Sequence, residues 1–89
     1  MRIVWDDAKR EANLRKHGFD FADGERVFSG ITYTIEDKRF AYGEQRFITF
    51  GLLRETVVVI AHTESKTELR MISMRKATRN EQTTYFENI

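Results

Sequence analysis

The sequence contains no cysteine, which excludes a disulfide framework, a thiolate nucleophile and a cysteine zinc site. The two histidines, His17 and His62, are too few for a dedicated transition-metal site, so we expect neither a metal nor a cofactor. The longest apolar run, from Val57 to Ala61, is far too short to cross a bilayer, and the N-terminal residues lack the apolar region of a signal peptide. We therefore expect a cytoplasmic protein with no membrane partner.

Several motifs of well-known enzyme classes are also missing. The chain has no G-x-x-x-x-G-K, G-x-G-x-x-G, H-E-x-x-H or G-x-S-x-G pattern. Nucleotide-driven chemistry, redox chemistry and a hydrolase triad therefore have no support from sequence motifs.

The composition is that of one small folded domain, which we expect to span residues 1–89. Of the 89 residues, 40% are hydrophobic and 12% are aromatic, which is ample for a single core. The 15 basic and 14 acidic residues nearly cancel, but the basic ones are concentrated between Lys9 and Lys16 and between Arg70 and Arg79. A local basic surface on a nearly neutral chain is typical of a protein that binds an anionic partner at one face.

The stretch from Leu69 to Glu81 begins as a strand and ends as the start of a helix. Thr78 and Glu81 form a T-x-x-E capping box, in which each side chain can accept a hydrogen bond from a free backbone N–H. Between these two signals lie four cations, which form either a seat for phosphate or a sheet edge kept soluble by charge: Arg70, Arg75, Lys76 and Arg79.

A first helix is predicted from about Asp7 to His17, with Asp6 as the N-cap and Gly18 after its last turn. We expect this helix to pack closely on its neighbour through Ala8 and Ala12. An adjacent polar stripe is either an ordinary solvated face or a surface that overlooks the neighbouring element, and it consists of Lys9, Asn13, Lys16 and His17.

The order of the remaining elements predicts an α+β fold. Short turns between successive strands indicate an antiparallel meander, and the apolar strand at 56–61 should be central. We expect an antiparallel sheet of about four strands, with two N-terminal helices and one C-terminal helix that packs onto the sheet through Tyr85 and Phe86. Besides the first helix, the predicted segments are strands at 2–5, 31–35, 47–52, 56–61 and from 69 onward, and helices at 20–29 and 79–88.

The basic residues suit cleavage of RNA by its own 2′-OH, a reaction that needs no metal. Arginine binds phosphate bidentately, while a base and an acid assist the two proton transfers. We expect His17 and Lys9 to be the candidates for proton transfer, because histidine and perturbed lysine act near neutral pH. Glu44 is a weaker candidate base.

Structural roles compete with these interpretations. His17 could equally interact with the carbonyl groups at the end of its helix. His62, beside the apolar strand, is more typical of a hydrogen-bonded edge or core residue, and Arg46 could pair with Glu44 or with Glu36 across the sheet. Strict alternation would also place two key cations, Arg70 and Arg75, on opposite faces of the last strand, so they converge only if the strand ends, twists or bulges near Ser73.

Three motifs in this order resemble the BrnT-type toxin family and together cover nearly the whole chain. They are W-D-x-x-K-x-x-x-N-x-x-K-H-G-x-x-F at 5–21, Y-G-E-x-R-F at 42–47 followed by Gly51, and R-x-I-S-x-R-K-A-x-x-x-E at 70–81. Gly24 and Gly30 depart from the pattern at positions that look structural.

The resemblance implies a RelE-like fold and an endoribonuclease toxin of a type II toxin–antitoxin pair, which cleaves mRNA and so blocks translation. It also implies a cognate antitoxin of the ribbon-helix-helix type, commonly in a complex of two toxins and two antitoxins, with operator DNA bound only through the antitoxin. The residues implied for catalysis are Lys9, His17, Arg46, Arg70 and Arg75. Supporting RNA contacts are Asn13, Lys16, Ser73 and Lys76, to which Arg79 is added from its place in the basic cluster.

Two other functions stay open at this point. One is a non-catalytic module that binds RNA or a protein, such as an inactivated toxin that acts as a corepressor. The intact basic residues argue against it only weakly, because binding alone would also use them. The other is an enzyme for a small anionic metabolite, for which the sequence has no pocket signature.

Overall fold

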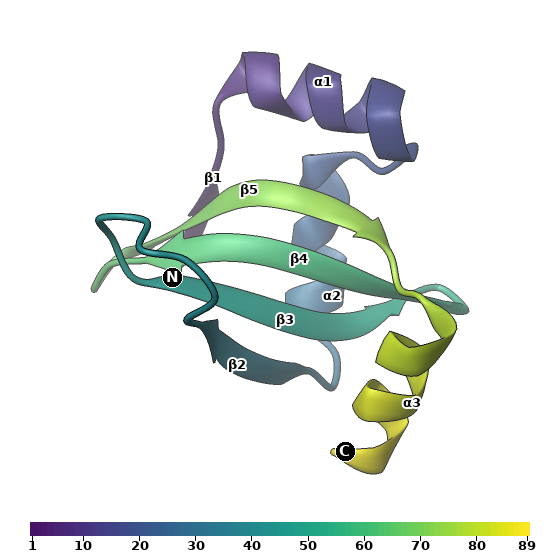
Figure 1. Ribbon diagram of the computed structural model, residues 1–89. Coiled ribbons are helices and arrows are strands. Elements are labelled where there is room, and N and C mark those ends of the chain that lie inside the picture. Colours follow the sequence, from purple (N-terminus) through teal and green to yellow (C-terminus); the bar gives the residue numbers. More distant parts are fainter.

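Five strands form one mixed sheet in the computed structural model, which describes residues 1–89 (Figure 1). The strand order is β1-β5-β4-β3-β2, and β2 to β5 form the antiparallel meander that the short turns predict. In chain order the elements are β1 (Arg2–Val4), α1 (Asp7–His17), the 3₁₀ helix η1 (Phe21–Asp23), α2 (Gly24–Phe28), β2 (Tyr33–Asp37), β3 (Arg46–Leu53), β4 (Thr56–Glu64), β5 (Glu68–Lys76) and α3 (Arg79–Glu87).

The sheet differs from the predicted one in its size and in the direction of one strand. We expected about four antiparallel strands, whereas β1 adds a fifth strand that runs parallel to β5, with Ile3 opposite Leu69. A three-residue strand has too little periodicity to indicate its partner, and this partner is distant in the chain. The fold is therefore α+β, as predicted, but its sheet is mixed and has one more strand.

Each face of the sheet has its own apolar cluster. The cluster under η1 and α2 consists of Phe21, Val27, Leu53, Val58, Ile60, Leu69, Met71 and Met74. The cluster on the opposite face, under α3, consists of Phe50, Val57, Val59, Ala77 and Tyr85. Successive residues of β4 alternate between the two clusters, so both of its faces are covered and its predicted central place is confirmed.

Gly51 allows α2 to lie close to β3. A Cβ atom at this position would lie 2.6 Å from Cγ1 of Val27, so any larger residue would push α2 away from the sheet. On the other face, the Tyr85 hydroxyl donates a hydrogen bond of 2.7 Å to the carbonyl oxygen of Ile31 and ties α3 to the segment before β2. Gly51 therefore determines how closely α2 lies on one face of the sheet, and Tyr85 holds α3 on the other face.

One extra residue in β5 interrupts its pairing with β4. Ser73 lies opposite Ala61, but Met71 lies opposite the next residue of β4, His62, so Ile72 has no partner. This arrangement is a β-bulge, and it reverses the alternation of side chains beyond it.

The bulge brings two arginines onto one face of the sheet. Met71 and Met74 both belong to the cluster under α2, although they are three residues apart. Their neighbours Arg70 and Arg75 therefore both lie on the opposite face, together with Ser73. The sequence allowed these arginines to share a face only if the strand ended, twisted or bulged near Ser73, and β5 has such a bulge.

The amide of Asn13 holds α1 against the sheet. Its Oδ1 accepts a hydrogen bond from the backbone N–H of Met74 at 3.0 Å, and its Nδ2 donates to the carbonyl oxygens of Met74 at 2.8 Å and Phe19 at 3.0 Å. β1 pairs with β5 only as far as Arg70, and the Asn13 side chain supplies to Met74 the hydrogen bonds that a neighbouring strand would otherwise supply. We expected α1 to pack through Ala8 and Ala12, and this is wrong, because both alanines are exposed and Asn13 is the buried residue of the helix.

Most of the capping signals in the sequence are confirmed. Asp6 caps α1, Gly18 ends it in a left-handed conformation with a φ of 77°, and the complete Thr78–Glu81 capping box begins α3. The predicted second helix is instead divided into η1, which Asp20 caps, and the five-residue α2. No helix of the chain combines the length and the apolar character needed to span a membrane.

Two expectations about apolar side chains are wrong. Phe86 was expected to pack onto the sheet with Tyr85, but it is 57% exposed because Tyr85 alone occupies the inner side of the short helix α3. The second strand was expected to begin at Ile31, which is 69% exposed, and β2 begins only at Tyr33.

Replacing Asn13 should destabilise the fold much more than its position on a polar helix surface suggests. We expect Asn13→Ala to lower the free energy of unfolding by about 2–3 kcal/mol, because the N–H and C=O groups of Met74 lose their partners. Urea unfolding measures this change. Asn80→Ala, an exposed asparagine in α3, is the control and should change the free energy by less than about 0.5 kcal/mol. Equal effects of the two substitutions would contradict the assigned role.

Candidate functional site

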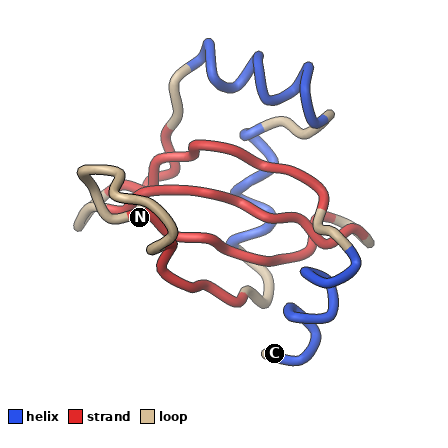
Figure 2. The backbone as a smooth tube through the Cα atoms, in the orientation of Figure 1, coloured by secondary structure: helices blue, strands red, loops and turns tan.

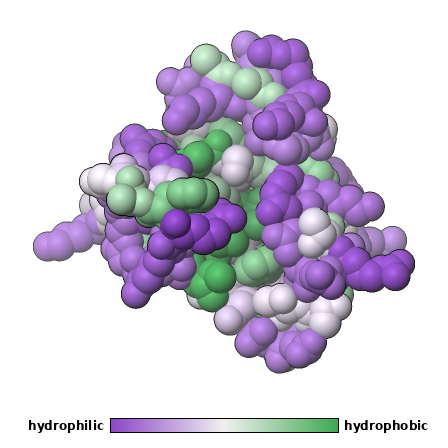
Figure 3. All heavy atoms as spheres, in the orientation of Figure 1, coloured by the Kyte–Doolittle hydropathy of each residue, from purple (hydrophilic) through white to green (hydrophobic).

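The arginine face, as we call the side of the sheet opposite α2, carries Arg46, Arg70, Ser73 and Arg75. At one end it is bordered by α3 and at the other by the connection between β2 and β3, which leaves its middle uncovered (Figure 2). Apolar atoms are exposed between hydrophilic side chains in the middle of this face (Figure 3). The face thus combines a basic rim with an apolar floor.

Arg46 and Arg70 share one carboxylate, that of Glu44. The Nη2 atom of Arg70 donates to both Glu44 oxygens, at 3.1 and 3.3 Å, and Nε of Arg46 lies 3.5 Å from one of them. Gly43, with a φ of 76°, turns the chain just before Glu44 in a conformation that glycine adopts readily. Of the two partners that the sequence offered for Arg46, the structure therefore selects Glu44.

Asp37 organises the connection between β2 and β3. Its buried carboxylate accepts two hydrogen bonds from the Arg39 guanidinium, at 2.8 and 2.9 Å, and one of 2.9 Å from the Tyr42 hydroxyl. The hydrogen bonds from Arg39 hold the pKa of Asp37 well below its usual range. The Tyr42 ring lies 4.1 Å from the guanidinium of Arg46, so a single network joins β2, the connection and β3.

Arg75 is held at the other end of the face by α3. Its two terminal nitrogens donate to the two oxygens of Glu81, at 2.7 and 2.8 Å, and Glu81 also accepts from the backbone N–H of Thr78 at 2.9 Å. The hydrogen bonds from Arg75 lower the pKa of Glu81 to about 2. The capping box that begins α3 therefore also orients Arg75.

Lys9, Lys16 and His17 lie along the edge of the arginine face. Together with Ile72 and Ser73 they line a shallow hollow of about 250 Å³ between α1 and β5. None of the three side chains forms an ion pair with a carboxylate. Because Ser73 borders both the hollow and the arginine face, unpaired basic groups of α1 lie next to the paired arginines.

Three predicted RNA contacts are not exposed basic or polar groups of this site. Asn13 borders the same hollow as Lys9 and His17, but it is buried and its amide is already bonded to backbone, so it is not free to bind RNA. Lys76 lies opposite Val58, which belongs to the cluster under α2, so the lysine projects on the other side of the sheet from Arg75. Arg79 is exposed at the start of α3.

The sequence interpretation missed two residues of the arginine face, Arg39 and Tyr42. Both donate hydrogen bonds to Asp37, the last residue of β2, which the sequence did not single out. The short spacing between Asp37 and Arg39 was the available signal, because a carboxylate and a guanidinium two residues apart at a strand end lie on the same side of the chain.

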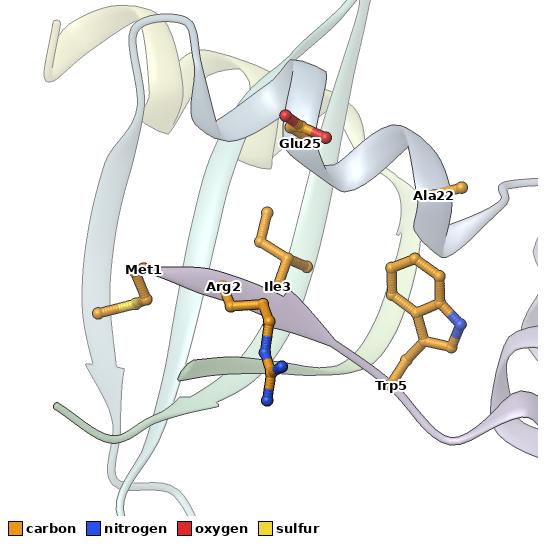
Figure 4. A pocket seen from close by; sticks show the side chains of 6 residues that line it. All are labelled: Met1, Arg2, Ile3, Trp5, Ala22 and Glu25. Atoms are coloured by element: carbon orange, nitrogen blue, oxygen red, sulfur yellow. The ribbon is translucent and has the colours of Figure 1, made fainter. Parts of the chain in front are cut away.

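A separate hollow lies between β1 and the η1–α2 segment (Figure 4). In that view Ile3 and Trp5 point toward the helices, whereas Arg2 points away from them. The volume is about 290 Å³, and the lining residues are Met1, Arg2, Ile3, Trp5, Ala22 and Glu25. The hollow contains none of the predicted site residues and does not open onto the arginine face.

His62 is fully buried in the core, as the sequence suggested. Its Nε2 lies 2.7 Å from the Thr49 hydroxyl, while its Nδ1 has no hydrogen-bond partner and is 3.6 Å from the Glu64 carboxylate. The ring stacks on Phe47 and meets the edge of Phe28 of α2, so it lies on the side away from the arginine face. Burial lowers the pKa of His62 to about 4.

The chemistry available at the arginine face is anion binding with proton transfer close by. Guanidinium groups bind phosphate oxygens in pairs, and His17 and Lys9 offer groups that accept or donate protons. Nowhere in the chain do three His, Asp or Glu side chains gather in a way that could hold a metal ion.

Comparison with known protein families agrees with this chemistry. Residues 5–81 match a family model described as the ribonuclease toxin of a type II toxin–antitoxin system. The chain is therefore a ribonuclease toxin in class, and a protein antitoxin is its implied partner. Within that class it belongs to the BrnT family. No curated protein matches the chain.

The buried imidazole of His62 makes stability depend on pH. Its pKa is about 4 in the folded chain and about 6.5 when unfolded, so only the unfolded chain takes up a proton between these values. The stabilising contribution is complete above pH 6.5 and falls as the pH decreases toward 4. We expect urea unfolding to show a loss of about 2 kcal/mol between about pH 7 and pH 5.

His62→Gln is the control for this pH dependence, because glutamine can still bond to Thr49 but does not titrate. The variant should lose little stability over the same pH interval. Carboxylates with low pKa values, such as Asp20 at about 2, affect stability mainly at lower pH. A loss of equal size in the variant would show that another group causes the effect.

Proposed function

We propose that this toxin is a metal-independent endoribonuclease that cleaves mRNA and thereby blocks translation. Its membership of the BrnT family supports the ribonuclease activity, and the clustering of basic side chains supports a mechanism built on phosphate binding. The position of Ser73 carries the proposal, because the bulged strand places it between Arg70 and Arg75 and beside Lys9 and His17.

In the proposed reaction the RNA 2′-OH attacks the adjacent phosphorus while the bond from phosphorus to the 5′ oxygen breaks. The products are a 2′,3′-cyclic phosphate and a 5′-hydroxyl. One of the two arginines Arg70 and Arg75 stabilises the negative charge that develops on the reacting phosphate, and the other binds a neighbouring phosphate of the RNA. Arg46 supports Arg70 through their shared partner Glu44. His17 or Lys9 accepts the proton of the 2′-OH, and the other donates one to the 5′ oxygen.

The two arginines act on successive parts of the RNA rather than on one atom. They are five residues apart in β5, a separation of roughly 15 Å along a strand. Glu44 and Glu81 also hold them toward opposite ends of the face. An unpaired strand lying across β5 would meet both guanidinium groups with Ser73 between them.

The antitoxin is proposed to be of the ribbon-helix-helix type and to cover the arginine face. Two toxins and two antitoxins would form the complex, which binds operator DNA only through the antitoxin. This arrangement would neutralise the nuclease, and both proteins would act in the cytoplasm. The basic rim of the face supports a partner that supplies acidic side chains.

Removing either central arginine should abolish cleavage. Arg70→Ala and Arg75→Ala should each reduce the rate by about 100-fold or more, because one removes the charge beside the reacting phosphate and the other removes a contact that positions the RNA. The assay uses purified antitoxin-free protein with a defined mRNA in EDTA and maps the product ends. Arg26→Ala, an exposed arginine in α2 on the other side of the sheet, should cleave normally.

Circular dichroism and thermal unfolding should change little in both variants, which separates loss of catalysis from loss of folding. Intact RNA with wild-type protein would call for the same assay with translating ribosomes. If RNA stays intact there too, the protein is a binding module such as a corepressor. Unchanged cleavage by both variants would overturn the assignment of the site.

Neutralising Glu44 should release its two arginines for RNA. Because Glu44 competes with phosphate for Arg46 and Arg70, we expect Glu44→Gln to tighten the binding of a non-cleavable RNA by about threefold to tenfold. Fluorescence anisotropy measures this affinity. Weaker binding in the variant would mean that Glu44 orients the arginines for RNA rather than competing with it.

A further inference from the structure

A hollow between the two ends of the arginine face has no role in the site described so far. Its volume is about 200 Å³, and it lies between the end of β2, the start of the β2–β3 connection and α3. Arg39 and Arg75 border it from two sides. The remaining lining residues are Ile35, Glu36, Asp37, Lys38, Ile48, Phe50 and Glu81.

The two guanidinium groups converge on this hollow with donors to spare. Arg39 bonds to Asp37 through Nε and Nη2, which leaves Nη1 free. Arg75 bonds to Glu81 and to a backbone carbonyl through its two terminal nitrogens, which leaves Nε free. Hydrogen bonding to Glu81 raises the pKa of Arg75, whereas the nearby charge of Arg39 lowers it, a repulsion that an anion in the hollow would relieve.

The carboxylate partners fix the direction of both guanidinium groups. Asp37 is buried and also bonded to Tyr42, so Arg39 is held on a rigid support although its own side chain is 68% exposed. A cation that is already ordered loses less conformational entropy when it binds a ligand. The two guanidinium groups are therefore oriented before any ligand arrives.

The floor of the hollow suits a flat, weakly polar group. Ile35, Ile48 and Phe50 provide apolar surface on the sheet, and guanidinium planes stack against nucleobases. A single unpaired nucleotide combines an anionic phosphate with such a base. An acidic peptide matches the charge of the arginines but has no counterpart for the apolar floor.

We propose that the hollow between Arg39 and Arg75 is an RNA-binding subsite for the phosphate and base of one unpaired nucleotide next to the cleavage position. This inference rests on the proposed function and assigns a role to Arg39 that its sequence did not suggest. The subsite restricts the substrate to single-stranded RNA, because a base paired in a duplex cannot turn onto the sheet. It also implies that residues of the β2–β3 connection contribute to the preference of the nuclease for particular RNA sequences.

The test is binding of a labelled single-stranded 12-nucleotide RNA oligomer with 2′-O-methyl sugars throughout, which cannot be cleaved because it has no free 2′-OH. Arg39→Gln alone leaves Asp37 buried without a charged partner, so the chosen variant is Asp37→Asn/Arg39→Gln. This double variant keeps the net charge of the chain and a neutral hydrogen-bonded pair. Fluorescence anisotropy should show binding about tenfold weaker than wild type, since one oriented phosphate contact is lost.

The control is Glu25→Gln/Arg26→Gln, which removes the same two charges from α2 on the other side of the sheet. It should bind the oligomer within about twofold of wild type, because neither residue lies near the arginine face. Thermal unfolding monitors both double variants. A labelled polyglutamate peptide of the same length serves as the competing ligand class.

The outcomes separate the subsite from the nuclease. Wild-type affinity in Asp37→Asn/Arg39→Gln overturns the subsite while leaving the proposed nuclease intact, and so does loss of peptide binding alone. Weakened RNA binding by a folded variant supports the subsite even if the wild-type protein fails to cleave RNA. If the wild-type protein does not bind the oligomer at all, the subsite is overturned.

Discussion

The unpaired residue Ile72 in β5 is the constraint on which the arrangement of the molecule depends. Without it, Arg70 and Arg75 would lie on opposite faces, and Met74 could not enter the same cluster as Met71. Beyond the bulge, β5 no longer has a strand on its outer side, and the amide of Asn13 supplies the missing hydrogen bonds. A local irregularity in one strand thus determines the composition of the core, the docking of α1 and the location of the basic groups.

Local signals in the sequence made most helices and strands predictable, but they did not predict which elements pair or pack with one another. Caps at Asp6 and Thr78 and the apolar run of β4 depend on near neighbours in the chain, and the structure confirms them. The parallel pairing of β1 and the buried role of Asn13 depend on contacts more than 60 residues away, which periodicity does not report. In the candidate site the basic residues and the pairing of Arg46 with Glu44 were foreseen, but the pairing of Arg70 with Glu44, the pairing of Arg75 with Glu81 and the place of Arg39 were not.

Every arginine of the arginine face is already paired with a carboxylate of the same chain. Glu44 binds two of these arginines, while Glu81 and Asp37 bind one each. An incoming anion therefore competes with these carboxylates for the charge of the arginines, even where single N–H donors are free, so the net gain per contact is small and depends on several contacts made together. Such a face favours a polymer with many phosphates over a single small anion.

The pairing of β1 with β5 has a consequence for how the protein is made. During synthesis, residues 2–4 and the helix that carries Lys9 and His17 leave the ribosome long before their partners in residues 68–76. Contacts of such high sequence separation form slowly, and here they cannot form at all until β5 has been translated. The hollow between α1 and β5 therefore cannot form on the nascent chain until β5 has been translated. The toxin's proposed activity is thereby delayed while the chain is still near the ribosome.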